Sequence, residues 1–391
     1  MATISRKLRM GMVGGGPGAF IGDVHRRAAC LDGDVELVAG AFASTAAKSR
    51  RKGRELALGR ARIYRSYTEM VEREALLPED ERIDFVSIVT PNHIHFPAAR
   101  AFLEAGFHVI CDKPMTLDVR EARQLKKIVA QSRRVFAVTY NYTGYPMVKL
   151  ARDLIREGSL GRLRKIVVRY PQGWLSTRIE MAGHKQAAWR TDPKRSGAAG
   201  CMGDIGTHAA NLAEYITGLK IVELSADLTT FVPGRPLDDD GNVLLRFQRG
   251  VRGLLYASQI SVGEENGLAI SIYGEEKGIE WHQEDPNILQ VKSQDGPLEV
   301  WTRGNPFVAD RSAAAARATR LPAGHPEAFH EAFANVYCNV TDTIRARNAR
   351  RRPEPLALDF PSVDDGLRGM IFIQTVIRSS RSSRKWLKVP R

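Results

Sequence analysis

The sequence lacks a long apolar run, a cysteine framework and an internal repeat. Among its 391 residues no apolar stretch approaches the roughly 18 residues of a membrane-spanning helix, which argues against an integral membrane protein. The four cysteines are scattered without CxxC spacing, which argues against a disulfide framework or a cysteine zinc site and favours a reducing cytoplasm. The basic first residues lack the apolar segment of a signal peptide, so we expect none.

Acidic residues are fewer than basic ones, 44 against 58, so the formal net charge is +14. Such an excess can indicate nucleic acid binding. The basic clusters at 48–54 and 345–352 are short, however, and neither is interleaved with the aromatic residues that stack on bases. We therefore expect a solvated surface that also attracts a small anionic cofactor, with no nucleic acid and no membrane as partner.

The first 140 residues alternate between strand-like and helix-like segments. Amphipathic stretches such as 97–105 and 119–130 separate the apolar ones, and Asp118 with Glu121 makes a capping box for the second. The alternation predicts right-handed βαβ units and a parallel sheet, which binds ligands beyond the carboxyl ends of its strands. The expected strands are 8–13, 35–42, 82–90, 107–111 and 134–140.

From residue 141 the pattern changes to strands that follow one another closely, after one helix at 147–157. Glycine-bearing turns separate several of them, which predicts a large, open and mostly antiparallel sheet in an α+β domain. We expect helices at 326–347 and 362–379, and a long loop at 304–324. The expected strands are 164–170, 222–230, 243–247, 252–259, 269–273 and 278–282. The predicted domains are 1–140 and 141–391.

A glycine-rich turn follows the first strand, at Gly14-Gly15-Gly16-Pro17-Gly18. Glycines let the backbone turn tightly and approach a pyrophosphate, and the following helix N-terminus offers amide donors. A plain glycine turn is the alternative, but a strand before it and a helix after it favour a dinucleotide loop. The spacing is irregular, because Pro17 to Phe20 lengthens the usual turn.

The second strand ends without the acidic residue that normally binds the ribose hydroxyls. Ser44, Thr45 and Lys48 follow instead. Hydroxyls and cations attract a 2′-phosphate, so these residues favour NADP over NAD. The alternative is that the cations are the exposed face of the next helix.

Two segments lie at the carboxyl ends of the third and fourth strands, Thr90–His95 and Cys111–Pro114. Pro114 restricts the backbone of Lys113, so we expect an ammonium group held at the cofactor crevice. His93 and His95 have half of the pattern of a zinc site, but no further ligand stands at a recognisable spacing, and we expect no metal.

A third segment, Gly203–His208, opens a helix. Asp204 and His208 lie one turn apart on its polar face, opposite an apolar stripe. Gly203 and Gly206 leave room for a substrate to approach. The alternatives are an N-cap for Asp204 and a buried core histidine for His208.

These segments together resemble the glucose-fructose oxidoreductase / inositol dehydrogenase / rhizopine-catabolism (Gfo/Idh/MocA) family over nearly the whole length. Asp112-Lys113-Pro114 resembles its Glu-Lys-Pro motif, with Asp in place of Glu, and Gly203–His208 is similar to its Asp-x-Gly-x-His signature. Thr90-Pro91-Asn92 resembles its nicotinamide-side turn, and Trp189-Arg190 its Trp-Arg pair. Residues 361–366 also resemble its C-terminal segment.

The resemblance implies a Rossmann domain for NAD or NADP and a larger domain whose open sheet often mediates dimers or tetramers. It implies oxidation of a secondary hydroxyl of a sugar, glycoside or inositol, or the reverse reduction. The cofactor-binding residues expected on this basis are Gly14, Gly16, Phe20, Ile21, Ser44, Thr45, Lys48, Thr90, Asn92, His95, Asp112 and Lys113.

The expected chemistry is hydride transfer from a carbinol to nicotinamide. Histidine titrates near neutrality, so His208 is the expected base. Lys113 stabilises the developing alkoxide, and Asp204 orients the substrate. The expected substrate-binding residues are Tyr142, Gln172, Trp174, Trp189, Arg190 and His325. Core packing is the alternative for the aromatic residues.

The sequence is also compatible with two other functions. One is a reductase of keto- or anhydro-sugars on the same fold, since fold alone does not choose the substrate. The other is a non-catalytic dinucleotide-binding regulator.

Overall fold

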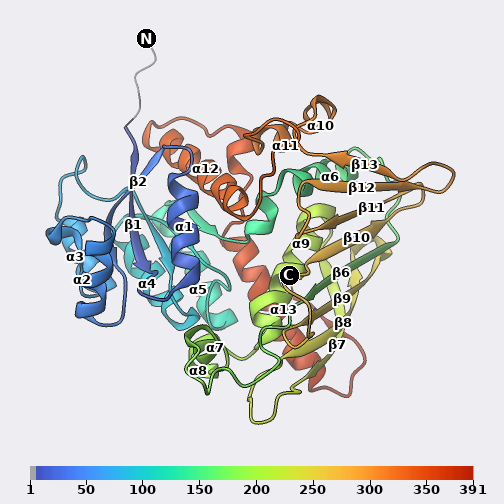
Figure 1. Ribbon diagram of the computed structural model, residues 1–391, viewed down its shortest axis with the longest axis horizontal. Coiled ribbons are helices and arrows are strands. Elements are labelled where there is room, and N and C mark those ends of the chain that lie inside the picture. Colours follow the sequence, from blue (N-terminus) through green and yellow to red (C-terminus); the bar gives the residue numbers. More distant parts are fainter. Residues whose placement is uncertain (1–5, 391) are drawn as a thin grey trace. The chain divides into compact units, whose positions relative to one another are not determined.

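The computed structural model describes residues 6–390, which divide into two compact units (Figure 1). The first unit holds the chain up to Thr139 together with Phe333–Leu367, and the second holds Tyr140–Ala332 and the chain from Arg368 onward. The assignment of domains to 1–140 and 141–391 stays a prediction. None of the helices in the described part of the chain is both long and apolar enough to cross a membrane.

The first unit contains a five-stranded parallel sheet in the order β2-β1-β3-β4-β5. Its strands are nearly continuous runs of buried apolar residues, as expected where helices cover both faces. This arrangement confirms the predicted parallel α/β fold. The strands are β1 (Leu8–Gly14), β2 (Val35–Ala41), β3 (Phe85–Val89), β4 (His108–Cys111) and β5 (Phe136–Val138).

The helices between these strands follow the predicted alternation. The side chain of Asp118 accepts a hydrogen bond from the backbone N–H of Glu121 at 2.8 Å, so the predicted cap of α5 is confirmed. The helices are α1 (Phe20–Cys30), α2 (Ala46–Glu55), α3 (Tyr67–Ala75), α4 (His95–Glu104) and α5 (Val119–Ser132), with the short turns η1 (Arg60–Arg62) and η2 (Asn92–Ile94).

A distant part of the chain completes this unit. Helix α12 (Phe329–Asn348) places Tyr337 against α1 and β3, where its hydroxyl lies 2.7 Å from Nδ1 of His25 and 2.8 Å from Oγ of Ser87. All three side chains are buried, and burial lowers the pKa of His25 to about 4. Beyond η6 (Pro355–Leu358), the carbonyl of Pro361 accepts from the N–H of Val138. The segment is therefore an integral part of the unit's core.

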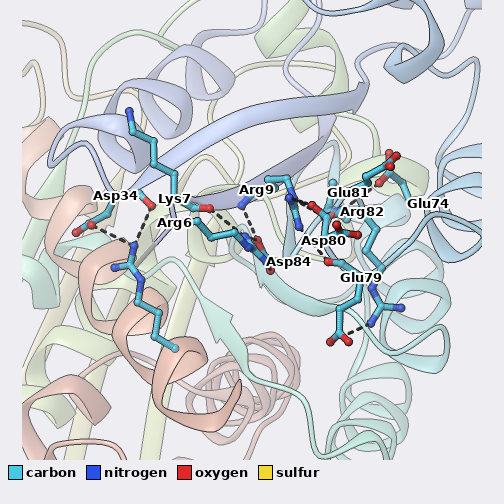
Figure 2. Close-up of polar contacts among 12 residues, drawn as sticks. Arg6, Lys7, Arg9, Asp34, Glu74, Glu79, Asp80, Glu81, Arg82 and Asp84 are labelled. Atoms are coloured by element: carbon cyan, nitrogen blue, oxygen red, sulfur yellow. Dashed lines mark hydrogen bonds and ion pairs between the residues drawn. The ribbon is translucent and has the colours of Figure 1, made fainter. Parts of the chain in front are cut away.

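Part of the charge excess is engaged where β1 begins (Figure 2). The carboxylate of Asp84 accepts from both terminal nitrogens of Arg6 at 2.7 Å and from the backbone N–H of Arg9. The guanidinium of Arg9 donates to carbonyl oxygens of the turn before β3, at residues 79–82. These arginines bind the ends of neighbouring strands together.

Glu74, also seen in Figure 2, has no exposed surface and accepts four hydrogen bonds. Its donors are Nε and Nη2 of Arg62, the hydroxyl of Tyr64 and the backbone N–H of Ile83, at 2.7–3.0 Å. A carboxylate with this set of donors fastens α3 to the strand that follows it.

We expect Glu74→Gln to lower the free energy of unfolding by about 3–5 kcal/mol, because it leaves the partly buried Arg62 without its counter-charge and turns an amide donor toward other donors. Urea denaturation measures this change. Glu69→Gln on the same helix is the control, since its ion pairs with Arg65 and Arg73 are 3.6 and 3.8 Å long and exposed, and about 1 kcal/mol or less is expected there. Equal losses in the two variants would contradict the prediction.

The second unit contains a nine-stranded sheet in the order β13-β12-β11-β10-β6-β9-β8-β7-β14. All of its pairings are antiparallel except that of β6 with β9, so the predicted mostly antiparallel sheet is confirmed. The strands are β6 (Lys165–Pro171), β7 (Ile221–Thr229), β8 (Asp240–Phe247), β9 (Arg252–Ser258), β10 (Ala269–Tyr273), β11 (Lys277–His282), β12 (Ile288–Ser293), β13 (Glu299–Thr302) and β14 (Leu387–Lys388).

Helices cover one face of this sheet, and the other face is open (Figure 1). Alternate residues of β8 are buried and exposed, and Leu244 on the open face is 46% exposed. The helices of this unit are α6 (Pro146–Arg156), α7 (Lys185–Arg190), α8 (Pro193–Ser196), α9 (Thr207–Thr217), α10 (Pro306–Arg311) and α11 (Ala313–Arg317), with α13 (Val363–Ser380) and the turns η3 (Asn141–Gly144), η4 (Met202–Gly206) and η5 (Gln248–Gly250).

The long loop predicted for 304–324 is wrong, since α10 and α11 lie there. Pro306 begins the first of these helices, and the hydroxyl of Ser312 caps the second by accepting from the N–H of Ala315. The alanines that follow Ser312 have the highest helix propensity of any residue.

Strands β12 and β13 were also missed, although residues 288–292 alternate in burial as strands of a half-buried sheet do.

Candidate active site

The glycine turn after β1 is shaped by close backbone contacts. Gly14 and Gly15 have positive φ angles of 95° and 69°. A Cβ on Gly14 would lie 2.6 Å from the carbonyl oxygen of Val89, and one on Gly16 would lie 2.5 Å from that of Phe42. Gly22 of α1 approaches Gly15 so closely that a Cβ would reach its Cα at 2.4 Å. Only glycine fits these positions, which brings β1 and the start of α1 together as in a phosphate-binding turn.

The other residues predicted around this turn differ in exposure. Phe20 begins α1 and is 65% exposed, and Ile21 is partly buried. Ser44 and Lys48 are exposed beyond the end of β2. The hydroxyl of Thr45 caps α2 by accepting from the N–H of Lys48 at 3.4 Å, so this residue has a structural task as well.

A buried histidine joins the two segments at the ends of β3 and β4. His95 has no exposed surface, and its ring nitrogens lie 2.9 Å from the carbonyl oxygen of Thr90 and 2.8 Å from that of Pro114. Burial lowers the pKa of this imidazole, while Asp112 and the two carbonyls oppose the shift. Because both nitrogens face carbonyls, His95 is unsuited to bind a metal ion, and it holds the two predicted cofactor segments in register.

Lys113 is positioned by its neighbours in the chain. Asp112 is 9% exposed, and its Oδ1 accepts from the backbone N–H of Lys113 at 2.8 Å and from the hydroxyl of Thr139 at 2.9 Å. The peptide bond between Lys113 and Pro114 is cis. The lysine side chain is partly buried. The aspartate that replaces the glutamate of the related motif therefore fixes the backbone from which the ammonium group extends.

The residues of this unit fit a bound nicotinamide dinucleotide. The glycine turn leaves backbone amides free of side-chain cover at the N-terminus of α1. At the end of β3, the Oγ1 of Thr90 is buried and has no hydrogen-bond partner among residues 6–390. A bound nucleotide can supply the hydrogen-bond partner that this hydroxyl lacks. Asn92, two residues later in the following turn, is also buried.

Asp204 lies in an unusual turn of the second unit. Residues 202–206 form a single π-helical turn in which the N–H of Thr207 bonds to the carbonyl of Met202, and α9 continues from it. A Cβ on Gly206 would lie 2.5 Å from the sulfur of Met202. Such turns insert one residue into a helix and are common at functional sites. Asp204 and His208 are therefore carried on one continuous helical segment, as predicted.

The carboxylate of Asp204 is engaged by two donors. Nε of Arg190 lies 3.0 Å from its Oδ2, and Nε2 of Gln259 lies 2.9 Å from the same oxygen. Arg190 also donates to Oε1 of Gln186 at 2.8 Å and lies 4.3 Å from the ring centroid of Trp189. The alternative reading of Asp204 as a plain N-cap is wrong, because Asp204 lies inside the turn Met202–Gly206, whose N-cap position is Cys201.

Three tyrosine rings surround His208. The ring centroids of Tyr142, Tyr140 and Tyr170 lie 4.8, 5.6 and 6.4 Å from that of the imidazole, which is 6% exposed. Burial raises the pKa of Tyr142 to about 12 and also raises that of Tyr170. Both tyrosines stay protonated at neutral pH, so His208 is the member of this group suited to accept a proton.

A chain of hydrogen bonds leads from Tyr142 to the predicted aromatic wall. The hydroxyl of Tyr142 donates to that of Tyr170, which donates to Oδ1 of Asn266 at 2.7 Å. Nε2 of Gln172 donates to the same oxygen at 2.8 Å, and its Oε1 accepts from the indole of Trp174 at 3.0 Å. The guanidinium of Arg190 lies 5.8 Å from the centroid of the Trp174 ring. Because Arg190 also donates to Asp204, this contact connects the hydrogen-bonded chain to that carboxylate.

The structure thus brings most predicted substrate residues into one cluster: Tyr142, Gln172, Trp174, Trp189 and Arg190. His325 lies elsewhere in this unit, exposed in the turn before α12, where its carbonyl accepts from Arg303. Sequence reasoning missed Tyr170, Gln259 and Asn266, which come from β6, from just after β9 and from the loop before β10. Of these three, Tyr170 could have been predicted from the sequence, because it ends the predicted strand 164–170 and stands two residues before Gln172.

Comparisons with known proteins agree with this architecture. Residues 8–140 match the family described as "Oxidoreductase family, NAD-binding Rossmann fold", and residues 148–280 match the "GFO/IDH/MocA C-terminal domain". The uncharacterized oxidoreductase YfiI of Bacillus subtilis is 34% identical over 98% of each chain.

Two solved structures are similar over almost the whole chain. An oxidoreductase from Sinorhizobium meliloti is 44% identical, with a TM-score of 0.88 over 98% of this chain and 100% of that one. An inositol dehydrogenase homolog from Azotobacter vinelandii, solved with NADH and myo-inositol, is 32% identical, with a TM-score of 0.89 over 98% of each chain. The chain therefore belongs to the Gfo/Idh/MocA family of oxidoreductases and carries its NAD-binding Rossmann fold.

Proposed function

We propose that this protein is an NAD(P)-dependent dehydrogenase that oxidises a secondary hydroxyl of a sugar, glycoside or inositol to a ketone. The observation that carries the proposal is the cluster around Asp204 and His208, where one carboxylate, one imidazole and several neutral amide and hydroxyl groups lie together. Such a set suits the alternating donors and acceptors of an uncharged polyol, and aromatic rings suit its C–H faces. The myo-inositol bound to the Azotobacter vinelandii homolog supports this substrate class.

His208 accepts the proton that the reacting hydroxyl loses, and its tyrosine neighbours exclude water from the imidazole. Lys113 donates a hydrogen bond to the oxygen on which negative charge develops. Asp204, held by Arg190 and Gln259, binds a neighbouring hydroxyl and so orients the substrate. The bound nicotinamide supplies the acceptor for the hydride.

The nucleotide is held by the glycine turn, with Gly14 and Gly16 at the pyrophosphate and Thr90, Asn92 and Asp112 at the nicotinamide side. The exposed Ser44 and Lys48, without an acid at the end of β2, favour NADP over NAD as the preferred form.

The first 140 residues serve as the nucleotide domain, and 141–391 bind substrate and form a homodimer or homotetramer. The cytoplasmic location stays a prediction from cysteine usage.

A substrate panel tests the proposal. Inositols, hexoses, other polyols and glycosides are each offered with NAD and with NADP, and the absorbance of the reduced nicotinamide is followed. We expect turnover of at least one cyclic polyol, and faster turnover with NADP. A response only to keto- or anhydro-sugars with the reduced nucleotide would favour the reductase instead. No turnover at all, together with binding to DNA that falls steeply with salt, would favour a regulator.

We expect Arg190→Ala to raise the KM for the substrate about tenfold with a smaller change in kcat, because Asp204 loses a donor that helps to fix its orientation. Steady-state kinetics at saturating nucleotide measure both constants. Gln186→Ala is the matched control, since it removes the other side-chain partner of Arg190 and keeps the bond to Asp204. A KM unchanged in Arg190→Ala would show that the bond between Arg190 and Asp204 does not contribute to substrate binding.

A further inference from the structure

The segment that carries Asp204 and His208 is fastened at its beginning by a single distant residue. Three consecutive backbone N–H groups, of Gly200, Cys201 and Met202, all donate to Asp238. Gly200 and Met202 donate to the two carboxylate oxygens, and Cys201 donates to the main-chain carbonyl, each at 2.8 Å. The first N–H groups of a helical segment have no partner within it, so they need an acceptor from elsewhere.

An ordinary cap comes from the residue just before the helix, but here it comes from the connection between β7 and β8. A carboxylate is well suited to this place, since the N-terminal end of a helix carries partial positive charge. The approach is close: a Cβ on Gly200 would lie 2.2 Å from the carbonyl oxygen of Asp238. The methyl end of Met202 adds an apolar contact with β8, where a Cβ on Gly241 would lie 2.5 Å from it.

The residue next to Asp238 holds the same connection in place. The carboxylate of Asp239 accepts from the backbone N–H groups of Phe231 and Val232 at 2.8 and 3.0 Å. Its carbonyl accepts from the N–H of Gln259 at 2.8 Å, and the side chain of Gln259 donates to Asp204. Two adjacent aspartates are therefore connected to Asp204. Asp238 is connected through the helical segment that carries Asp204, and Asp239 is connected through Gln259, whose side-chain amide donates to Asp204.

We propose that Asp238 is a positioning residue, which fixes the turn Gly200–Met202 and thereby the orientation of Asp204 and His208. It deepens the proposed function, because it names a residue outside the substrate cluster on which the geometry of that cluster depends. Burial raises the pKa of the Asp238 carboxyl, and its two backbone donors oppose that shift. The residue acts through the helix and not by contact with a substrate.

Hydrogen exchange of the full-length protein, read by mass spectrometry, tests the attachment directly. In Asp238→Asn the new NH₂ group faces a backbone N–H, so one of the two carboxylate bonds is lost. We expect exchange across residues 200–208 to become about tenfold faster or more, as the loss of one such bond implies. Gly200→Ala, which pushes on the same carbonyl, should have the same effect. Unchanged exchange in both variants would overturn the proposal.

Kinetics separate positioning from a merely structural contact. We expect Asp238→Asn to lower kcat about ten- to a hundredfold at temperatures where it is fully folded, with nucleotide affinity unchanged, because small displacements of reacting groups slow the reaction this much. The matched control is Asp118→Asn, which makes the same change at the N-terminus of another helix, α5, and leaves residues 200–202 bonded. Faster exchange with an unchanged kcat, or equal losses of kcat in both variants, would contradict the role.

The two proposals fail in different ways. A wild-type protein without turnover of any polyol would overturn the proposed function, while the exchange experiment needs no substrate and still decides whether Asp238 holds Asp204 and His208 in place.

Discussion

Lys113→Ala is expected to lower kcat about a hundredfold or more, which corresponds to the roughly 2.7–4 kcal/mol that one hydrogen-bond donor contributes to a developing oxyanion. Asp112 fixes the backbone N–H of Lys113, and His95 holds the carbonyl of Pro114 that follows it. The ammonium group therefore extends from an ordered main chain, and the reaction loses a positioned charge when it is removed.

Initial rates at saturating substrate measure the loss, and titration of the nicotinamide fluorescence shows whether the nucleotide is still bound. Lys126→Ala is the control, because this lysine is half exposed on α5 and its ammonium group pairs with the exposed Asp364. Its rate should stay within about twofold of the parent. A Lys113→Ala protein with a near-normal rate would exclude the lysine from the reaction.

His208→Ala is expected to lower kcat about a hundredfold or more as well, because general bases contribute this much and no neighbour can replace it. The nearest rings belong to tyrosines, and burial raises the pKa of Tyr142 to about 12. Their hydroxyls do not give up a proton near neutral pH. The carboxylate of Asp204 already accepts hydrogen bonds from Arg190 and Gln259.

The pH profile provides a second readout. His208 accepts a proton only in its neutral form, so kcat/KM in the oxidation direction is expected to fall at acid pH, and the variant should lose this dependence. Added imidazole should restore part of the rate by entering the space left among the tyrosine rings. His282→Ala, on the sheet beside Glu280, is the control with an unchanged profile. Retention of the pH dependence in His208→Ala would assign the proton transfer to another group.

The order of strands and helices in the first unit could be predicted because local rules agree there. Apolar runs of four to seven residues alternate with amphipathic ones, and the cap at Asp118 is readable from Glu121 three residues later. The family resemblance, which the comparisons confirm, rested on short motifs whose residues are close in sequence. Lys113 and the Asp204–His208 pair belong to such motifs.

The partners of those residues could not be predicted in the same way. Gln259 and Asn266 are ordinary polar residues of strand ends and loops, and only the pairing of β6 with β9 and β10 brings them beside Gln172 and Asp204. Asp238 lies 34 residues after Asp204 in a run of three aspartates that resembles a solvated turn. Contacts between segments this far apart depend on sheet topology, which a local pattern does not specify.

The return of the chain to the first unit at Phe333 has a consequence for how the protein is made. Tyr337 is synthesised about three hundred residues after His25, so the side of α1 and β3 that packs on it stays uncovered during that time. A truncated product that stops near residue 140 would leave His25 and Phe85 without the aromatic ring that covers them. The unit with the glycine turn is thus completed only after residues 140–332 of the second unit have been made.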